Sequence, residues 1–290
     1  MQVDYLSDDE TLKGQTKPET VLVLGFFDGV HRGHQHVIQT ARKLANKYHL
    51  PLSVMTFDQH PSQIFKTASS ENFRYLNTVD QKVTQMEKNK VDCLYITKFT
   101  KKFASLSPQQ FVDQYIVQLN AKLVVVGFDY TFGAGASATG DDLRGYSHQQ
   151  FDVKVVHKLT HTDVKVSSTR IRALIKAGKV ELANTLLGYK YETNGRLIKT
   201  PDGQYGIELT NSLQQIPTAG RFECQMLYGK RPLSVFVEIS AKDGLLIIKN
   251  QKMVDAINVK QNQLVSLKWL KLISESSAMT RRQHLFEISN

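Results

Sequence analysis

Cysteine is scarce in this sequence of 290 residues, and neither of its two cysteines lies in a metal-binding or disulfide pattern. Cys93 and Cys224 have no CxxC or CxxH beside them, which excludes a disulfide framework and a structural zinc site. A reducing compartment is therefore expected. The sequence also lacks any window near the ~18 uncharged apolar residues of a membrane span, and MQVDYLSDDE is acidic where a signal peptide needs basic residues. We expect a cytoplasmic protein with no membrane association.

The composition is that of a globular protein, with 41% hydrophobic and 22% charged residues, which excludes disordered and fibrous classes. The length suggests two domains of roughly 150 residues each. The net charge of +10 favours anionic partners, but the basic residues are spread along the chain without Lys/Arg blocks. Small phosphate-bearing ligands therefore fit as well as nucleic acid.

Short apolar runs alternate with amphipathic stretches through about the first 185 residues. The runs are rich in β-branched and aromatic residues, as strands buried on both faces are, and they lie at 21–27, 52–57, 93–99, 122–128 and 152–159. One helix is expected over 37–48, and another begins at a Ser107 cap with Pro108 in its first position. The order predicts an α/β domain with a doubly wound parallel sheet.

The pattern changes after two helices that Gly178 and Gly188 are expected to close. From Tyr189 onward, short alternating runs broken by turn residues predict a small antiparallel domain that resembles a β-barrel or a sandwich. We therefore expect a first domain over residues 1–187 and a second over 188–290. The tail from residue 274 is expected to be a helix or a loosely docked end.

The strongest local signal is GFFDGVHRGH at 25–34, which leaves a strand, turns on glycines and opens a helix. Unpaired amides and the helix dipole at such a start favour a phosphate. His31 and His34 are both able to direct imidazole N–H donors at one triphosphate, and Gly33 lets the backbone approach it. A metal site that adds His36 is the less favoured alternative, because no carboxylate or cysteine completes it. There is no GxxxxGK[ST] P-loop.

A second signal is VSSTRIR at 166–172, at the head of a later helix. Its hydroxyls suit either helix capping or phosphate binding, and the guanidinium of Arg170 or Arg172 suits the same anion. Taken alone, the segment is best interpreted as a capped basic helix. Beside the histidine motif, it predicts a shared phosphate site.

Together the two motifs resemble the HxGH superfamily of nucleotidylyltransferases, and longer stretches resemble the prokaryotic bifunctional riboflavin kinase/FAD synthetase family, whose first domain adenylylates FMN. The matching stretches are 25–38, 55–61, 98–112, 124–141 and 166–189, which lie across essentially all of residues 20–189. The resemblance implies transfer of AMP from ATP to FMN with Mg²⁺, so ATP and FMN are the expected partners and nucleic acid is not.

The resemblance also implies the site. The catalytic residues would be His31, His34, Ser168 and Arg172. The residues implied for nucleotide and flavin binding are Gly25, Phe26, Phe27, Asp28, Gly29, Gly33, Phe57, His60, Pro61, Gly127, Asp129, Tyr130, Phe132, Ser167 and Thr169. Phe57, Tyr130 and Phe132 would either cover the flavin ring or belong to the core. Asp129 would contact adenosine or metal at the end of a strand.

This chain departs from the family pattern in both halves. Phe26 stands where the family usually has Asn, and Gln59 replaces a usual Pro, but neither change removes a charged catalytic group. In the second half the family's GxPTAN segment aligns with 205–211, where Glu208 and Leu209 replace Pro and Thr. That exchange removes a metal ligand and adds like-charge repulsion beside a nucleotide phosphate. We expect a degenerate riboflavin-kinase-like domain without kinase activity.

A later PTA at 217–219 matches a different segment of the family, so it does not restore the kinase motif. Two other functions remain as alternatives for the chain. One is an HxGH adenylyltransferase acting on another phosphate, such as nicotinamide mononucleotide or phosphopantetheine. The other is a non-catalytic flavin-binding or RNA-binding regulator, which intact His31, His34 and Arg172 argue against.

Overall fold

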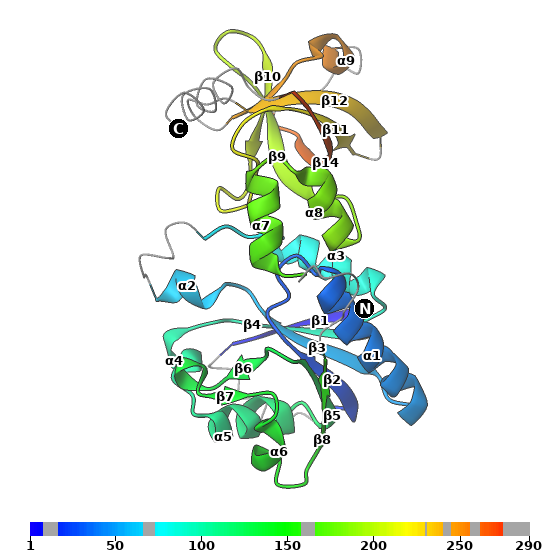
Figure 1. The fold of residues 1–290 in the computed structure, drawn as a ribbon, viewed down its shortest axis with the longest axis vertical. Helices are drawn as coiled ribbons and strands as arrows, with labels where there is room; N and C mark the ends of the chain where they lie inside the picture. The colour runs from blue at the N-terminus through cyan, green and yellow to red at the C-terminus, as the bar shows by residue number, and fades with distance from the viewer. Residues whose placement is uncertain are drawn as a thin grey trace, which may run out of the picture. The chain divides into compact units, whose positions relative to one another are not determined.

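The computed structural model describes residues 1–7, 17–65, 73–157, 166–229, 231–239, 245–255 and 262–274. The chain forms two compact units, one of Met1–Phe73 with Val79–Lys165 and the other of Arg74–Thr78 with Val166–Asn290 (Figure 1). The expected helix or loose end beyond residue 274 lies outside the described residues. No described helix is long and apolar enough to cross a membrane.

The first unit is built on a six-stranded parallel sheet, which confirms the predicted doubly wound α/β class. Its strand order is β1-β4-β3-β2-β5-β8. The strands are β1 Gln2–Leu6, β2 Thr20–Leu24, β3 Leu52–Phe57, β4 Cys93–Thr97, β5 Ala121–Gly127 and β8 Asp152–Val156. Five of these match predicted runs, whereas β1 was not predicted because it is a short edge strand with mostly incompletely buried residues. A two-stranded sheet of β6 Thr131–Phe132 and β7 Ala138–Thr139 stands beside it.

Helices cover both faces of this sheet, since alternate residues of β2 enter two separate cores (Figure 1). Val21 and Val23 pack with α1, whereas Leu22 and Leu24 pack with the other helical layer. The helices are α1 Arg32–Tyr48, α2 Pro61–Ile64, α3 Val79–Lys88, α4 Lys101–Ala104, α5 Pro108–Phe111 and α6 Leu143–Tyr146. Ser107 caps α5 as predicted, but the helix continues as a π-helix over Val112–Val117.

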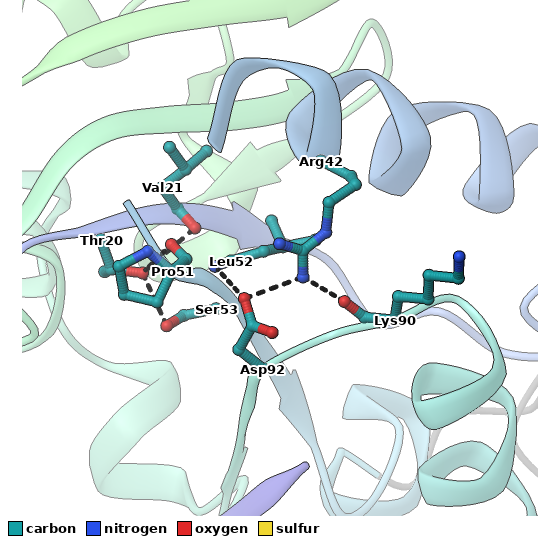
Figure 2. A network of polar contacts seen from close by, with 8 residues as sticks. All are labelled: Thr20, Val21, Arg42, Pro51, Leu52, Ser53, Lys90 and Asp92. Carbon is teal, nitrogen blue, oxygen red and sulfur yellow. Dashed lines mark hydrogen bonds and ion pairs between the residues drawn. The ribbon is translucent and has the colours of Figure 1, made fainter. Parts of the chain in front are cut away.

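A polar network fastens α1 to the amino-terminal ends of two strands (Figure 2). Arg42 of α1 donates to the Asp92 carboxylate at 2.8 Å and to the carbonyl of Lys90. The same carboxylate oxygen accepts the backbone amide of Leu52 at 2.8 Å. These bonds fix α1 against β3 and β4, so the head of α1 at the opposite end of the sheet is held in register with the strands.

The second unit contains a closed antiparallel barrel, which confirms the predicted barrel-like domain. Its strand order is β10-β13-β12-β11-β14-β9. The strands are β9 Glu192–Lys199, β10 Tyr205–Leu209, β11 Arg221–Tyr228, β12 Arg231–Ile239, β13 Leu246–Ile248 and β14 Leu264–Ser274, with α9 Gln251–Asp255 before the last. Phe222, Met226 and Trp269 are fully buried, so side chains fill the barrel interior.

Two helices belong to the barrel unit, although the sequence placed them in the first domain. These are α7 Ser168–Lys176 and α8 Val180–Leu187, whose apolar residues share the core of the barrel. Asn184 of α8 donates to the carbonyl of Trp269 at 2.9 Å and accepts the amide of Tyr191 at 2.7 Å. The main part of this compact unit therefore begins at residue 166, whereas the sequence predicts the domain boundary between residues 187 and 188.

A short segment from the first half of the chain also belongs to the barrel unit. Tyr75 donates its amide to the carbonyl of Leu213 at 2.8 Å and accepts the amide of Gln215 at 2.9 Å. Leu76 is fully buried in the barrel-unit core. The chain therefore passes from one unit to the other three times, before residue 74, after residue 78 and before residue 166.

Asn184→Ala is expected to destabilise the barrel unit by about 2–4 kcal/mol, because it leaves the Tyr191 amide and the Trp269 carbonyl without their side-chain partner in the core. Denaturant unfolding followed by the fluorescence of Trp269, the single tryptophan of the chain, measures the change. Thr185→Ala, at an exposed position of the same helix, is the control and should change stability by less than about 0.5 kcal/mol. Equal stability of the two variants would contradict the bridging role of Asn184.

Candidate functional site

The GFFDGVHRGH motif forms the turn between β2 and α1. This turn lies where the strand order reverses, because β3 and β4 extend from β2 on one side and β5 and β8 on the other. Open α/β sheets bind ligands in the crevice at the carboxyl ends of the strands at such a reversal. The structure therefore places the motif where a nucleotide site is expected in this fold.

His31 is the residue that caps α1. Its Nδ1 accepts the backbone amide of His34 at 3.3 Å. The side chain is only 5% exposed. The ring thus lies at the positive end of the α1 dipole.

His34 stacks on His31 with ring centroids 3.6 Å apart and planes at 15°. Its other neighbour is the Phe27 ring, which it meets edge-on at 5.2 Å. Its Nδ1 is buried, and burial, followed by the nearby charges of His31 and Lys82, lowers the pKa of His34 well below the ordinary value. At neutral pH the site therefore holds an uncharged His34 imidazole that can donate a hydrogen bond.

The turn itself is strained. Phe27 and Val30 have φ of +53° and +35°, and Gly29 between them has +81°. A positive φ is uncommon for a phenylalanine and an outlier for a β-branched valine, at a cost of order 1–3 kcal/mol each. The side-chain amide of Gln35 donates to the carbonyl of Val30 at 2.8 Å and helps to hold this conformation. Strain held in place by surrounding contacts is typical of functional sites.

The glycines of the motif leave room for its rings. A Cβ on Gly25 would lie 2.7 Å from the ring of Phe27, and one on Gly33 would lie 3.2 Å from two ring atoms of His31. Asp28 in the same turn is 4% exposed. Gly33 was predicted to admit a ligand phosphate, and the structure adds that it also leaves space for the His31 imidazole.

Gly33→Ala is expected to lower activity about tenfold while leaving stability equal or up to about 1 kcal/mol higher. Alanine favours a helix, but its Cβ pushes on the His31 ring. Gly145→Ala, on an exposed helical glycine with open space around it, is the matched control and should leave activity unchanged. Steady-state rates and thermal unfolding of the two variants check this, and an unaltered rate for Gly33→Ala would contradict it.

The predicted flavin-side loop after β3 contacts the motif. His60 caps α2 by accepting the amide of Ser62 at 3.2 Å, and Pro61 occupies the first helical position. The His60 ring stacks on Phe73 at 4.3 Å and meets Phe26 edge-on at 5.0 Å. Phe26, where the family pattern has Asn, therefore packs against the loop that contains His60.

The predicted aromatic residues differ in how much surface they offer. Phe132 is 6% exposed and packs in an aromatic cluster with Phe111 and Tyr146, which fits the core interpretation. Tyr130 stacks on Phe132 at 6.0 Å, and burial raises the pKa of its hydroxyl. Phe57 is partly exposed and packs edge-on against two further aromatic rings of the cluster, Phe99 and Phe103.

Gly127 and Asp129 follow β5 at the same edge of the sheet as the histidine turn. Gly127 ends β5, and a Cβ there would approach a carboxylate oxygen of Asp129 to 3.3 Å. Asp129 is exposed, so its carboxylate is accessible to a ligand. Among the described residues, no three His, Cys, Asp or Glu side chains gather in a way that would hold a metal.

The second motif lies at the head of α7, in the barrel unit. Ser167 caps this helix by accepting the amide of Arg170 at 3.3 Å, and Arg172 donates to the Thr169 hydroxyl at 3.4 Å. Ser168 begins the helix, whose first turn has no acidic residue. A single phosphate site made by this helix and the histidines stays a prediction.

The degenerate kinase segment is part of the barrel wall. Glu208 is exposed on β10, and the following Thr210 donates its amide and its hydroxyl to the carbonyl of Asn194 at 3.0 and 3.1 Å. A Cβ on Gly195 would lie 2.6 Å from the carbonyl oxygen of Glu208, so this close approach of β9 and β10 requires glycine at position 195. Thr218 of the later PTA bonds the carbonyl of Lys176 at the end of α7.

Sequence reasoning missed Lys82 of α3, whose ammonium lies beneath the histidine turn. A weak signal was present, because Lys82 occupies the apolar face formed by Val79, Val83 and Met86 at helical spacing. A lysine at such a position is buried only if acceptors meet it. Its hydrogen bonds are described below.

Comparisons with known proteins agree with this geometry. The FAD synthetase family model matches residues 13–170. The bifunctional riboflavin kinase/FMN adenylyltransferase of Listeria monocytogenes is 42% identical over 198 residues, which are 68% of this chain and 63% of that protein. This chain therefore spans less than two thirds of that relative. The protein of the same name from Bacillus subtilis is 39% identical over 75% of this chain and 71% of its own length.

A solved structure is similar over nearly the whole chain. A crystal structure described as that of a macrolide-efflux protein from Streptococcus pneumoniae superimposes with a TM-score of 0.79 and 29% identity. The match covers 94% of this chain and all of that one. The combination of a parallel-sheet unit with a barrel unit is therefore present in a known structure.

Proposed function

Because the chain belongs to the FAD synthetase family, we propose that it transfers the adenylyl group of ATP to the terminal phosphate of FMN, forming FAD and releasing pyrophosphate. The observation that carries this proposal is the stacked pair His31 and His34 at the head of α1, where the strand order reverses. The pair lies at the positive end of a helix, which favours a phosphate.

The chemistry needs positioning more than acid–base catalysis. The FMN phosphate is largely dianionic near neutral pH, so an oxygen of it attacks the α-phosphorus without losing a proton. As that bond forms, the bond to pyrophosphate breaks and pyrophosphate leaves with the electron pair. His31, the α1 amides and an uncharged His34 would stabilise negative charge on the transferred group, and Arg172 would bind the triphosphate.

Magnesium fits this site as a companion of the nucleotide. Mg²⁺ is usually held by substrate phosphates and one or two carboxylates, which agrees with the absence of a three-ligand cluster among the described side chains. The exposed Asp129 is the carboxylate we propose for this contact. When bound, the ion would neutralise charge on the triphosphate.

We further propose that the protein lacks riboflavin kinase activity and that residues 1–187 contain the residues of the transferase site. Leu209 stands where the family has a metal-binding threonine, and Glu208 adds a carboxylate where a nucleotide phosphate would lie. The barrel interior is filled by large apolar side chains, which supports a structural role for that unit.

The test is incubation of the purified protein with Mg²⁺ and ATP labelled at the α-phosphate, together with either FMN or riboflavin. We expect labelled FAD and an equal amount of pyrophosphate from FMN, and neither FMN nor FAD from riboflavin. Formation of FMN from riboflavin would contradict the loss of kinase activity. Parallel incubations contain nicotinamide mononucleotide or phosphopantetheine in place of FMN. Label in the adenylylated product of either compound, with none in FAD, would show that FMN is not the substrate.

A further inference from the structure

Lys82 is a buried cation that the chemistry described so far does not use. It lies on α3 and is 4% exposed. Its Nζ donates to the carbonyls of Phe26 and Phe57 at 2.9 and 3.0 Å and to the Thr56 hydroxyl oxygen at 3.1 Å. An ammonium has three N–H groups, and these three acceptors match them. No donor is left for a substrate.

Through Lys82 the three acceptors join the end of β3 to the histidine turn. Phe57 is the last residue of β3, and Phe26 is the residue that enters the strained part of the turn. The Thr56 hydroxyl also donates to the Phe26 carbonyl at 2.9 Å. The ammonium lies 4.4 Å from the centre of the Phe26 ring, so Phe26 is held by its carbonyl and by a cation–π contact.

We propose that Lys82 is a positioning residue for adenylyl transfer, whose ammonium holds the strained turn that directs His31 and His34 without touching substrate. This inference rests on the proposed function. Strained backbone at Phe27 and Val30 persists only when its surroundings determine it, and the entry to the turn is bonded to α3 through Lys82. A displacement of about 1 Å in such a turn is enough to cost about 10²-fold in rate.

The charge of Lys82 gives this role a pH signature. The charged groups that face it are Asp28 in the turn and Asp58 after β3, and it acts in turn on His34 of α1. Burial lowers the pKa of Lys82 to about 8, and the two carboxylates partly oppose that shift. Above this pH the neutral amine has two N–H groups for three acceptors. The value of kcat/KM should therefore fall as the pH rises, with an apparent pKa near 8.

Stability should change in the opposite direction over the same range. Between about 8 and the ordinary lysine pKa of about 10.5, the unfolded chain binds more protons at this residue than the folded chain does. Lys82 therefore makes stability rise with pH in the range where activity falls. A residue with only a structural role would not make activity and stability change in opposite directions with pH.

The experiment compares Lys82→Met with Lys88→Met, an exposed lysine on the same helix. We expect Lys82→Met to lower kcat for FAD formation by about 10-fold to 10²-fold with less than about threefold change in KM for FMN, and to lose the alkaline decline in kcat/KM. Lys88→Met should keep both. Lys82→Met with the wild-type kcat and pH profile would overturn the proposal.

Two further measurements keep the test decisive. Amide hydrogen exchange over residues 26–34 should quicken in Lys82→Met and not in Lys88→Met, and this readout does not require catalysis. If the wild type is inactive but the two variants differ in exchange, the proposed FMN adenylylation is wrong and the positioning role of Lys82 stands. Equal exchange in the two variants would reject the positioning role. If Lys82→Met does not fold, the wild type supplies the test: a kcat/KM that stays flat through pH 8 while the melting temperature rises with pH overturns the proposal.

Discussion

Replacing His31 by alanine is expected to lower kcat for FAD formation by about 10²-fold or more, the effect of removing one transition-state contact worth ~3 kcal/mol. His31 also caps α1, so the alanine variant should lose about 0.5–2 kcal/mol of stability as well. Rates from chromatographic separation of FMN and FAD, with thermal unfolding on the same samples, measure both effects.

His31→Asn separates the two roles of His31. Asparagine is among the best capping residues, so this variant should keep the helix start while it lacks the imidazole. We expect it to be as slow as the alanine variant and close to the wild type in stability. A fast asparagine variant would show that His31 acts only as a helix cap, and the proposed site would fail.

Arg172→Ala is expected to reduce the rate to a similar degree, by about 10²-fold or more, because a guanidinium binds phosphate oxygens through two parallel hydrogen bonds. Rates measured over a range of ATP concentrations should show a raised KM for ATP as well. Arg172→Lys keeps the charge but not the planar fork, so it should recover only part of the loss.

Arg170→Ala is the matched control for Arg172. Both arginines lie in the first turns of α7, and the sequence motif by itself left either one able to bind phosphate. We expect Arg170→Ala to keep most of the activity. Full turnover in Arg172→Ala together with loss in Arg170→Ala would reverse their roles, and full turnover in both would reject α7 as part of the site.

Much of the fold followed from local patterns. Apolar runs of six to eight residues between amphipathic stretches predicted the buried parallel strands, because strands covered on both faces have no polar alternation. Ser107 before Pro108 predicted a helix start, which the capping bonds confirm. The histidine motif predicted a strand, a turn and a helix in that order, and β2 and α1 have that arrangement.

Other features had no local signal that was strong enough. Residues 74–78 pair with the barrel unit because Tyr75 meets Leu213 and Gln215, a contact between segments far apart in the chain. Phe132 was assigned equally well to a flavin site or to the core, and only its burial among other rings distinguishes the two. Propensity and spacing describe near neighbours, so they do not report such distant contacts.

The sequence by itself determined the class of the first unit, the barrel that follows it and the order of strand, turn and helix around the histidines, because these depend on periodicity, glycines and residue type. Tertiary structure alone decided that α7 and α8 pack with the barrel and that His31 caps α1. It also decided that Lys82 is buried against the turn before α1. The physical reason is that a buried charge is stable only where acceptors converge, and these acceptors come from the end of β3 and from the turn that follows β2.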